Sequence, residues 1–521
     1  MKTILGMLIV LVMQLVYAQN TVEGVHPRIK VSEGTLEGQY KSGIASFKGI
    51  PFAAPPVGKF RWREPQPVQP WQGVRKADRF GPRAMQRPIF DDMQFRSDGM
   101  SEDCLYLNVW TPAKTFKEKL PVLVYFYGGG LIAGDGSEFR YDGESMARKG
   151  IVTVTVNYRL NIFGFFSHPE LTSESPYHAS GNYGFLDQLA ALKWVQQNIG
   201  AFGGDPTKVT IAGESAGSYS VSAQMTSPLA KKLFRGAIGE SGALLDNHRP
   251  RPSLAEAEQN GLAFAKAVQA NSLAELRALP AEELLAATAK FDANFSATID
   301  GYFFPDDPVS IFKRGAQAKV PLLVGWNTEE SNYRGLLGDK APNIANFNQI
   351  INERFGKQAA QLLQVYKPQS DEEVKQVATD FAGDQFIAYG TWRWSDLHSQ
   401  TGNQPVYRYH YARPRPAMRH QTGEIATGAV HSAEIEYALG NLPTNRVYNW
   451  QPEDYQVSAI MQAYFVNFIK TTDPNGLGLP VWPRVKAGEP AQLMHIDVET
   501  KSITEQHRDR YLLLEKLSDA K

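Results

Sequence analysis

Short apolar runs alternate along this chain with longer amphipathic stretches. Four runs rich in β-branched or apolar residues predict buried strands, because a strand covered on both faces shows no polar alternation: residues 122–126, 151–158, 209–212 and 320–324. Between the second and third runs, Leu186, Leu189, Ala190 and Trp194 recur at helical spacing and predict one apolar helix face. This alternation favours a mostly parallel sheet with helices on both faces.

Two further stretches predict helices in the second half of the chain. Residues 255–289 are rich in Ala, Glu and Leu, which indicates two or more helices inserted between strands. An apolar face on a late helix is formed by Ile460, Met461, Tyr464, Phe465 and Phe468. No internal repeat, charge block or low-complexity linker marks a boundary, so we predict one domain over residues 19–521.

The first twenty residues have the layout of a secretory signal peptide. Lys2 precedes an apolar run over residues 4–13, and the small residue Ala18 lies at a plausible cleavage site. A transmembrane helix needs about 20 apolar residues, whereas this run is interrupted at Gln14. We therefore expect residues 1–18 to be removed, leaving a secreted or periplasmic protein that starts at Gln19 and has no stable membrane anchor.

The composition argues against several classes of binding partner and of structural cross-link. The 521 residues include 54 Lys+Arg and 54 Asp+Glu, so the chain lacks the basic excess of nucleic-acid-binding proteins, and nucleic acid is not an expected partner. One Cys, Cys104, excludes an intramolecular disulfide and a Cys-based zinc site. Export without disulfides fits a bacterial periplasm or medium better than a disulfide-rich eukaryotic secretory protein.

A candidate nucleophile follows the third predicted strand. Residues 208–220 read KVTIAGESAGSYS, which places the pattern G-x-S-x-G between a strand and a helix-compatible segment. The turn is so sharp that side chains at Gly213 and Gly217 would collide with neighbouring backbone, while Ser215 is lifted clear of the sheet. Its Oγ also faces the N-terminus of the following helix, which favours developing negative charge. The pattern predicts a catalytic serine.

A glycine-rich loop follows the first predicted strand. Residues 127–130 read YGGG, and consecutive glycines let backbone N–H groups approach a ligand closely. Such a loop can supply oxyanion-hole donors together with the N–H of the residue after the nucleophile, here Ala216.

A serine nucleophile requires a histidine base and an acid that orients it. The strand 320–324 is followed by Glu329 and Glu330, and both are open as the acid, since open α/β sheets place their sites at the carboxyl ends of strands. In the order Ser, acid, His, spacing alone does not choose the base among seven histidines beyond Ser215: His248, His398, His410, His420, His431, His495 and His507.

Motifs across nearly the whole chain resemble the type B carboxylesterase family, which includes bacterial esterases, liver-type carboxylesterases and cholinesterases. The resemblance implies an α/β-hydrolase fold: a central, mostly parallel sheet flanked by helices, with helical insertions that form a gorge or cap. The matching segments are GIPFAAPPVGKFRW (49–62), SEDCLYLNVWTP (101–112), YGGG, VNYRLNIFGF (156–165), GNYGFLDQLAALKWVQQNIGAFGGDP (181–206), GESAG, TDPNG and LPVWP.

The family's catalytic residues fall on particular positions of this chain. The resemblance implies Ser215 as nucleophile and Glu330, the second of the paired acidic residues, as acid. The base lies in a G-x-x-H segment followed by E-I-E, here GAVHSAEIEYALG, which implies His431.

Further roles come from the same resemblance. Gly129, Gly130 and Ala216 match the oxyanion-hole donors, and Ser241 and Glu434 match positions that support the base from behind. Two pairs match buried structural ion pairs of the family: Arg61 with Glu102, and Arg159 with Asp187.

The chain also departs from the family pattern at its gorge loop. Family members usually have a Cys at the position of Ala84, bonded to the Cys of SEDC, so Cys104 has lost its partner and the loop 85–103 is expected to be freer. This loop contains no Trp, whereas cholinesterases place their choline-binding Trp there. Phe90 and Phe95 are the only candidates to replace it, so a cholinesterase is not expected.

Taken together, these residues predict a serine carboxylester hydrolase that acts on small-molecule esters through an acyl-enzyme. It needs no metal or organic cofactor. A lipase or polyester hydrolase with the same triad remains an alternative, as do a non-catalytic adhesion module of the neuroligin kind and a binding protein whose triad is blocked. The sequence does not set the acyl or alcohol preference, for which residues 85–103 and 253–300 are the expected pocket walls, and it leaves the oligomeric state open.

Overall fold

The computed structural model describes residues 26–246, 251–291, 295–419 and 426–519. The predicted signal peptide, residues 1–18, lies outside the described residues, and so do His248 and His420.

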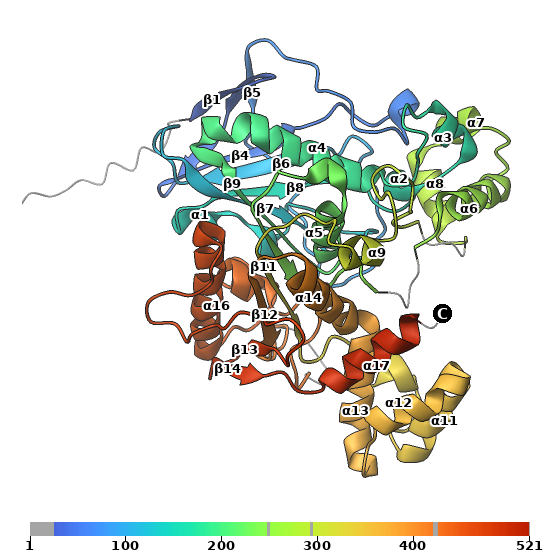
Figure 1. Ribbon diagram of the computed structural model, residues 1–521. Coiled ribbons are helices and arrows are strands. Elements are labelled where there is room, and N and C mark those ends of the chain that lie inside the picture. Colours follow the sequence, from blue (N-terminus) through green and yellow to red (C-terminus); the bar gives the residue numbers. More distant parts are fainter. Residues whose placement is uncertain (1–25, 247–250, 292–294, 420–425, 520–521) are drawn as a thin grey trace, which may run out of the picture.

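The described part of the chain forms an 11-stranded sheet and a small 3-stranded sheet (Figure 1). In the large sheet the neighbouring strands β8, β7, β9, β10, β11, β12 and β13 run parallel, whereas the strands at both edges pair antiparallel. Its spatial order is β14 (Lys501–Thr504), β13 (Gln492–Ile496), β12 (Val406–Tyr411), β11 (Leu322–Asn327), β10 (Gly236–Glu240), β9 (Gly204–Glu214), β7 (Leu120–Phe126), β8 (Val152–Val156), β6 (Tyr106–Thr111), β4 (Ile44–Pro51) and β3 (Gln39–Lys41). The small sheet comprises β1 (Arg28–Val31), β2 (Gly34–Glu37) and β5 (Val74–Lys76).

The four predicted strands are confirmed as β7, β8, β9 and β11, and their residues are buried almost throughout. The boundaries differ, because β9 starts five residues before the apolar run and β8 ends before Asn157. The outer strands were not predicted, since most are short and partly exposed and lack a continuous apolar run.

Helices cover both faces of the large sheet. A Cβ on Gly239 would meet Trp394 of α14 (Tyr389–Thr401) and Ser218 of α5 (Ala216–Thr226). A Cβ on Gly236 would instead lie 3.5 Å from Phe468 of α16 (Pro452–Thr471). Because side chains three positions apart in a strand point to opposite faces, α5 and α14 cover one face and α16 the other, as Figure 1 also shows.

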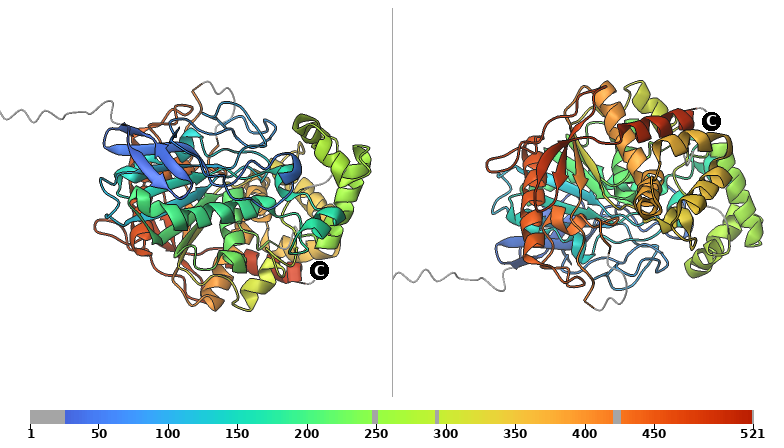
Figure 2. Two further views of the ribbon diagram at one scale, coloured as in Figure 1. Left: turned by 90° about the horizontal axis from the view of Figure 1, so that it is seen from above. Right: turned by 90° about the horizontal axis from the view of Figure 1, so that it is seen from below.

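The predicted helical insert contains three helices: α6 (Leu254–Ala267), α7 (Leu273–Ala278) and α8 (Ala281–Thr288). Figures 1 and 2 show them at the opposite end of the molecule from the small sheet. A second apolar core lies among the later helices, which include α11 (Ile344–Phe355), α13 (Asp371–Gly383) and α17 (Arg508–Asp519). These insertions flank the carboxyl edge of the sheet, where the candidate residues lie.

Both expected ion pairs are present, with Arg159–Asp187 buried and Arg61–Glu102 partly buried. Arg159 donates from Nε and Nη2 to the two carboxylate oxygens of Asp187 at 2.8 and 2.7 Å. Arg61 binds Glu102 in the same two-fold manner at 2.6 and 2.5 Å. Removing either carboxylate would leave a buried arginine uncompensated, which typically costs about 3–5 kcal/mol of stability.

The loop 85–103 is bounded by two buried residues that share a cavity of about 10 Å³, Ala84 and Cys104. Cys104 is a free thiol, and burial raises its pKa well above the usual range. Polar contacts attach the loop instead: Arg96 donates to the Ser137 carbonyl at 2.6 Å and to Asp142 at 2.7 Å. The greater freedom expected for this loop stays a prediction.

Candidate active site

Ser215 occupies a sharp turn between β9 and α5. Its backbone has φ 55° and ψ −119°, a strained combination for a residue with a side chain. The turn closes because the two flanking glycines touch backbone: a Cβ on Gly217 would lie 2.0 Å from the Phe126 carbonyl oxygen, and one on Gly213 2.5 Å from Gly217. The collision predicted from the sequence is thus confirmed at both positions.

Two hydrogen bonds join the serine, a histidine and a glutamate. His431 Nε2 lies 2.9 Å from Ser215 Oγ, and His431 Nδ1 lies 2.6 Å from Glu330 Oε2. Glu330 lies in the turn after β11, where its Oε1 accepts a 2.7 Å hydrogen bond from the Asn327 N–H. Glu329 points elsewhere and accepts from the Gly428 N–H at 2.9 Å. The two adjacent glutamates therefore have different partners, and it is Glu330 that contacts His431.

The other described histidines downstream of Ser215 lie away from it. His398 is buried, bonded to the Val320 carbonyl, and burial lowers its pKa to about 4. His410 is held on β12, and burial together with His495 lowers its pKa to about 4 as well. His495 lies beside it on β13, and His507 precedes α17. Local pattern alone carried no signal that separated these histidines from His431.

The glycine-rich loop lies directly after β7 and lines the pocket around Ser215. Gly129 and Gly130 have φ of 112° and 66°, which favour glycine, and a Cβ on Gly129 would lie 2.3 Å from the Ala133 carbonyl oxygen. Ala216 opens α5 beside them. Within the described residues, no group accepts a hydrogen bond from the N–H of these three residues.

Ser241 and Glu434 form a layer behind the histidine. Ser241 Oγ donates to Glu434 Oε1 at 2.9 Å, and the Asn327 side-chain amide donates to Glu434 Oε2 at 2.6 Å. Asn327 also donates from this amide to the Val430 carbonyl, next to His431. One residue at the end of β11 thus connects Glu330, Glu434 and the histidine loop.

Glu214 was not predicted as a site residue, although it is the variable position of the GESAG motif. Its Oε1 lies 3.3 Å from His431 Nε2, and its side chain is almost fully buried. Burial raises the pKa of Glu214 to about 8, against the opposing charge of His431. Burial also lowers the pKa of His431, but the charges of Glu214 and Glu330 outweigh it and raise this pKa to about 9.

These two ionisations depend on each other. A protonated Glu214 is neutral and no longer raises the pKa of His431. Because burial favours that neutral form, a proton on Glu214 keeps the imidazole less basic than it would be beside two carboxylates.

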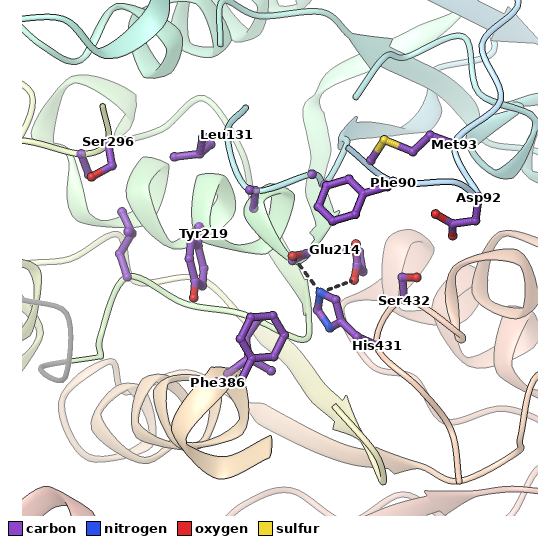
Figure 3. A pocket seen from close by; sticks show the side chains of 18 of the residues that line it. Phe90, Asp92, Met93, Leu131, Glu214, Tyr219, Ser296, Phe386, His431 and Ser432 are labelled. Atoms are coloured by element: carbon purple, nitrogen blue, oxygen red, sulfur yellow. Dashed lines mark hydrogen bonds and ion pairs between the residues drawn. The ribbon is translucent and has the colours of Figure 1, made fainter. Parts of the chain in front are cut away.

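A cavity of about 630 Å³ surrounds Ser215 (Figure 3). Figure 3 shows Phe90 and Met93 along one side, Tyr219 and Leu131 along another, and Phe386 beyond His431. The expected walls contribute Phe90, Asp92 and Met93 from the loop 85–103, and Asn260, Ser296 and Ala297 from residues 253–300. Arg251 and Pro252, just before the second expected wall, also line the cavity. The remaining wall was missed, since it comes from separate elements of the fold: Arg140, Tyr141, Tyr219, Leu244, Phe386 and Ile387.

Phe386 and Ile387 lie on a π-helical turn, Asp384–Ala388, between α13 and α14. The ring of Phe386 meets the His431 imidazole edge-on at a centroid distance of 5.1 Å.

Among the described residues, no group of three or more His, Cys, Asp or Glu side chains is placed to hold a metal ion. In the same part of the chain, no helix is long and apolar enough to cross a membrane.

The parallel sheet, the strained turn at Ser215 and the convergence of the serine, histidine and glutamate define an α/β-hydrolase. The family model of the carboxylesterase family matches residues 25–512, and the chain belongs to this family. The protein is accordingly an enzyme that hydrolyses carboxylic esters, and its substrates are small molecules.

Curated relatives agree with this assignment. Fumonisin B1 esterase of Sphingopyxis macrogoltabida is 36% identical over 473 residues, which are 87% of this chain and 83% of the relative. Carboxylesterase 5A of Canis lupus familiaris is 36% identical over 484 residues, with 87% and 81% of the two chains covered.

Solved structures are similar over almost the whole chain. A structure of PNB esterase superposes with a TM-score of 0.80 at 29% identity and covers 94% of this chain and 99% of its own. A carboxylesterase of Geobacillus stearothermophilus superposes with a TM-score of 0.78 at 30% identity, over 94% and 99% of the two chains.

Proposed function

We propose that Ser215, His431 and Glu330 are the catalytic triad of this carboxylesterase. The observation that carries the proposal is the unbroken hydrogen-bonded chain from Ser215 Oγ through the imidazole to Glu330 Oε2, at 2.9 and 2.6 Å. These are the distances at which a histidine can take a proton from a hydroxyl while a carboxylate orients the ring.

The proposed reaction has two halves. Ser215 Oγ attacks the ester carbonyl carbon as His431 takes its proton, and His431 then gives this proton to the departing alcohol, leaving an acyl-enzyme. Water then attacks the acyl carbonyl with His431 as base, which releases the carboxylic acid and restores Ser215. The oxyanion of each tetrahedral intermediate is held by the N–H groups of Gly129, Gly130 and Ala216, which need no side chain to reach it.

We further propose that the preferred substrates are soluble esters with apolar acyl and alcohol groups of small to medium size. A cavity of about 630 Å³ lies within the range that encloses a small ligand. Its lining around Ser215 includes several apolar side chains: Phe90, Met93, Leu131, Leu244, Phe386 and Ile387.

The triad predicts that Ser215→Ala loses most of its turnover because the substitution removes the hydroxyl that forms the acyl-enzyme. We expect kcat for a nitrophenyl ester to fall by about 10⁴- to 10⁶-fold. A fluorophosphonate should label the parent enzyme on the peptide that contains Ser215 and should not label the variant. Ser175→Ala, a change outside the pocket, serves as the control and should behave like the parent enzyme. Substantial turnover by Ser215→Ala would refute the nucleophile assignment.

The cavity predicts a maximum in chain-length preference. With nitrophenyl esters of acyl groups from acetate to palmitate, we expect kcat/KM to peak at a short or medium chain and to fall for the longest, which the cavity does not enclose. Activity that rises steadily to palmitate, and further on emulsified long-chain triglyceride, would favour a lipase instead.

The contact between Glu214 and His431 predicts a shift in the pH profile. Glu214→Gln removes the group whose ionised form raises the pKa of His431, so the imidazole can no longer be stabilised as a cation by this side chain and loses its proton at lower pH. Since the base must be neutral, the acidic limb of the kcat/KM profile should move to lower pH. Glu282→Gln, on the exposed side of α8, should leave the limb in place. A limb that stays fixed or moves to higher pH in Glu214→Gln would contradict this coupling.

We also propose that the enzyme is exported and that residues 1–18 are its cleaved signal peptide. Support comes from the Lys2–apolar–Ala18 layout of the sequence. Expression of the full chain in a bacterial host should yield periplasmic or secreted protein whose first residue, by intact mass, is Gln19. Cytoplasmic protein that retains Met1 to Ala18 would refute the proposal.

A further inference from the structure

The loop 85–103, called here the rim loop, carries part of the pocket wall. Phe90, Asp92 and Met93 line the cavity, and a Cβ on Gly129 would lie 3.0 Å from Met93 Cε, so Met93 packs against the glycine-rich loop. The cysteine at its carboxyl end, Cys104, is free. The position of the rim loop over the site therefore depends on noncovalent contacts.

Asp92 attaches the middle of the rim loop to a buried arginine. Arg140 Nη2 donates to Asp92 Oδ2 and to the Asp92 carbonyl, both at 2.8 Å. The Arg140 side chain is only 4% exposed and also pairs through Nε with Glu138 at 3.1 Å. Burial raises the pKa of Asp92, but the charges of Arg140 and Arg415 outweigh it and lower this pKa below its ordinary value, so Asp92 is an anion between two cations.

Arg415, the second cation, lies on the segment after β12. Its Nη1 is 3.7 Å from Asp92 Oδ2 and donates to the Tyr448 hydroxyl at 2.8 Å, and its guanidinium lies over the Tyr448 ring at 4.7 Å. Its Nη2 is 3.1 Å from Glu436 Oε2. The side chain is 5% exposed, so these contacts hold a nearly dry guanidinium in one orientation.

The same guanidinium holds the backbone next to His431. Arg415 Nη2 donates to the carbonyl of Ser432, the residue that follows His431. Ser432 has φ 68°, a left-handed conformation that is unfavourable for a residue other than glycine and needs support from its surroundings. Loss of this hydrogen bond would leave the left-handed backbone of Ser432 unsupported, and a change at Ser432 would shift the backbone of His431, to which it is directly joined.

We propose that Arg415 is a positioning residue for His431 and that Asp92 joins it to the rim loop, so that one ion cluster sets both the pocket rim and the imidazole. The cluster consists of Asp92, Arg140 and Arg415. This proposal rests on the role as catalytic base proposed above for His431. If the proposal holds, the contact of Asp92 with the two arginines and the proton transfer at Ser215 are energetically coupled.

The test compares Arg415→Gln, Asp92→Asn and the double variant in the full chain. Steady-state kinetics with nitrophenyl acetate are expressed per active site, as titrated with a fluorophosphonate. We expect Arg415→Gln to lower kcat by about tenfold or more with a smaller change in KM, and to slow phosphonylation of Ser215 by a similar factor, because small misplacements of catalytic groups cost large factors in rate. Asp92→Asn should act in the same direction, and the double variant should be no slower than Arg415→Gln.

A matched control is available in the same loop. Arg96 also attaches the rim loop, through Ser137 and Asp142, but has no contact with Arg415 or Ser432 among the described contacts. Arg96→Gln should raise KM and leave kcat within about twofold. If Arg415→Gln does not fold, Arg415→Lys replaces it, and a kcat loss is again expected, since lysine cannot hold Ser432, Glu436 and Tyr448 together.

The outcomes separate this proposal from the triad itself. Values of kcat per titrated site within twofold of the parent for Arg415→Gln and Asp92→Asn would overturn it, and so would effects that multiply in the double variant. A loss of titratable sites with unchanged kcat per site would show a purely structural role and would overturn it as well. Turnover by Ser215→Ala would instead refute the proposed triad, which these variants leave untouched.

Discussion

The backbone turn at Ser215 is the constraint on which the rest of the site depends. A non-glycine residue at φ 55° and ψ −119° is unstable in isolation and persists only where its surroundings fix it. Here β7 approaches Gly217 so closely that no Cβ fits, and the Ser215 N–H donates to the Glu240 carbonyl of β10 at 2.8 Å. The parallel sheet therefore serves as the scaffold that holds one strained residue, and the glycine-rich loop and the turn after β11 end at the same edge.

The second general feature is an excess of acidic groups around one imidazole. Four buried glutamates, Glu214, Glu240, Glu330 and Glu434, lie within or just behind the site. Burial raises the pKa of Glu214, Glu240 and Glu434, because a buried site disfavours the charged form of a carboxyl group. Glu330 is the one of these four whose hydrogen bond to His431 is made at Nδ1, the nitrogen turned away from Ser215. In this arrangement Glu330, the proposed acid of the triad, is distinguished from its neighbours by hydrogen bonding and not by residue type.

Much of the fold could be predicted from the sequence because buried parallel strands leave continuous apolar runs. The proposed nucleophile, Ser215, could be predicted because its turn requires glycines at fixed positions. The proposed base, His431, could not be predicted from the residues alone. Ser215 and His431 are 216 positions apart, and nothing local distinguishes His431 from the other downstream histidines; the family resemblance made that choice. Glu214, the Phe386 wall and the pairing of Asp92 with Arg415 were missed for the same reason, since each depends on distant segments that only tertiary packing brings together.

In the proposed mechanism, the turn at Ser215 places its Oγ between the His431 imidazole and the N–H groups of Gly129, Gly130 and Ala216. A crystal structure of the fluorophosphonate adduct measures this arrangement most directly, because the phosphoryl oxygen stands where the oxyanion would form. We expect phosphorus bonded to Ser215 Oγ, the phosphoryl oxygen about 2.7–3.1 Å from the three backbone nitrogens, and His431 still hydrogen-bonded to Glu330. An adduct on another residue, or a phosphoryl oxygen turned away from these nitrogens, would contradict the proposed mechanism.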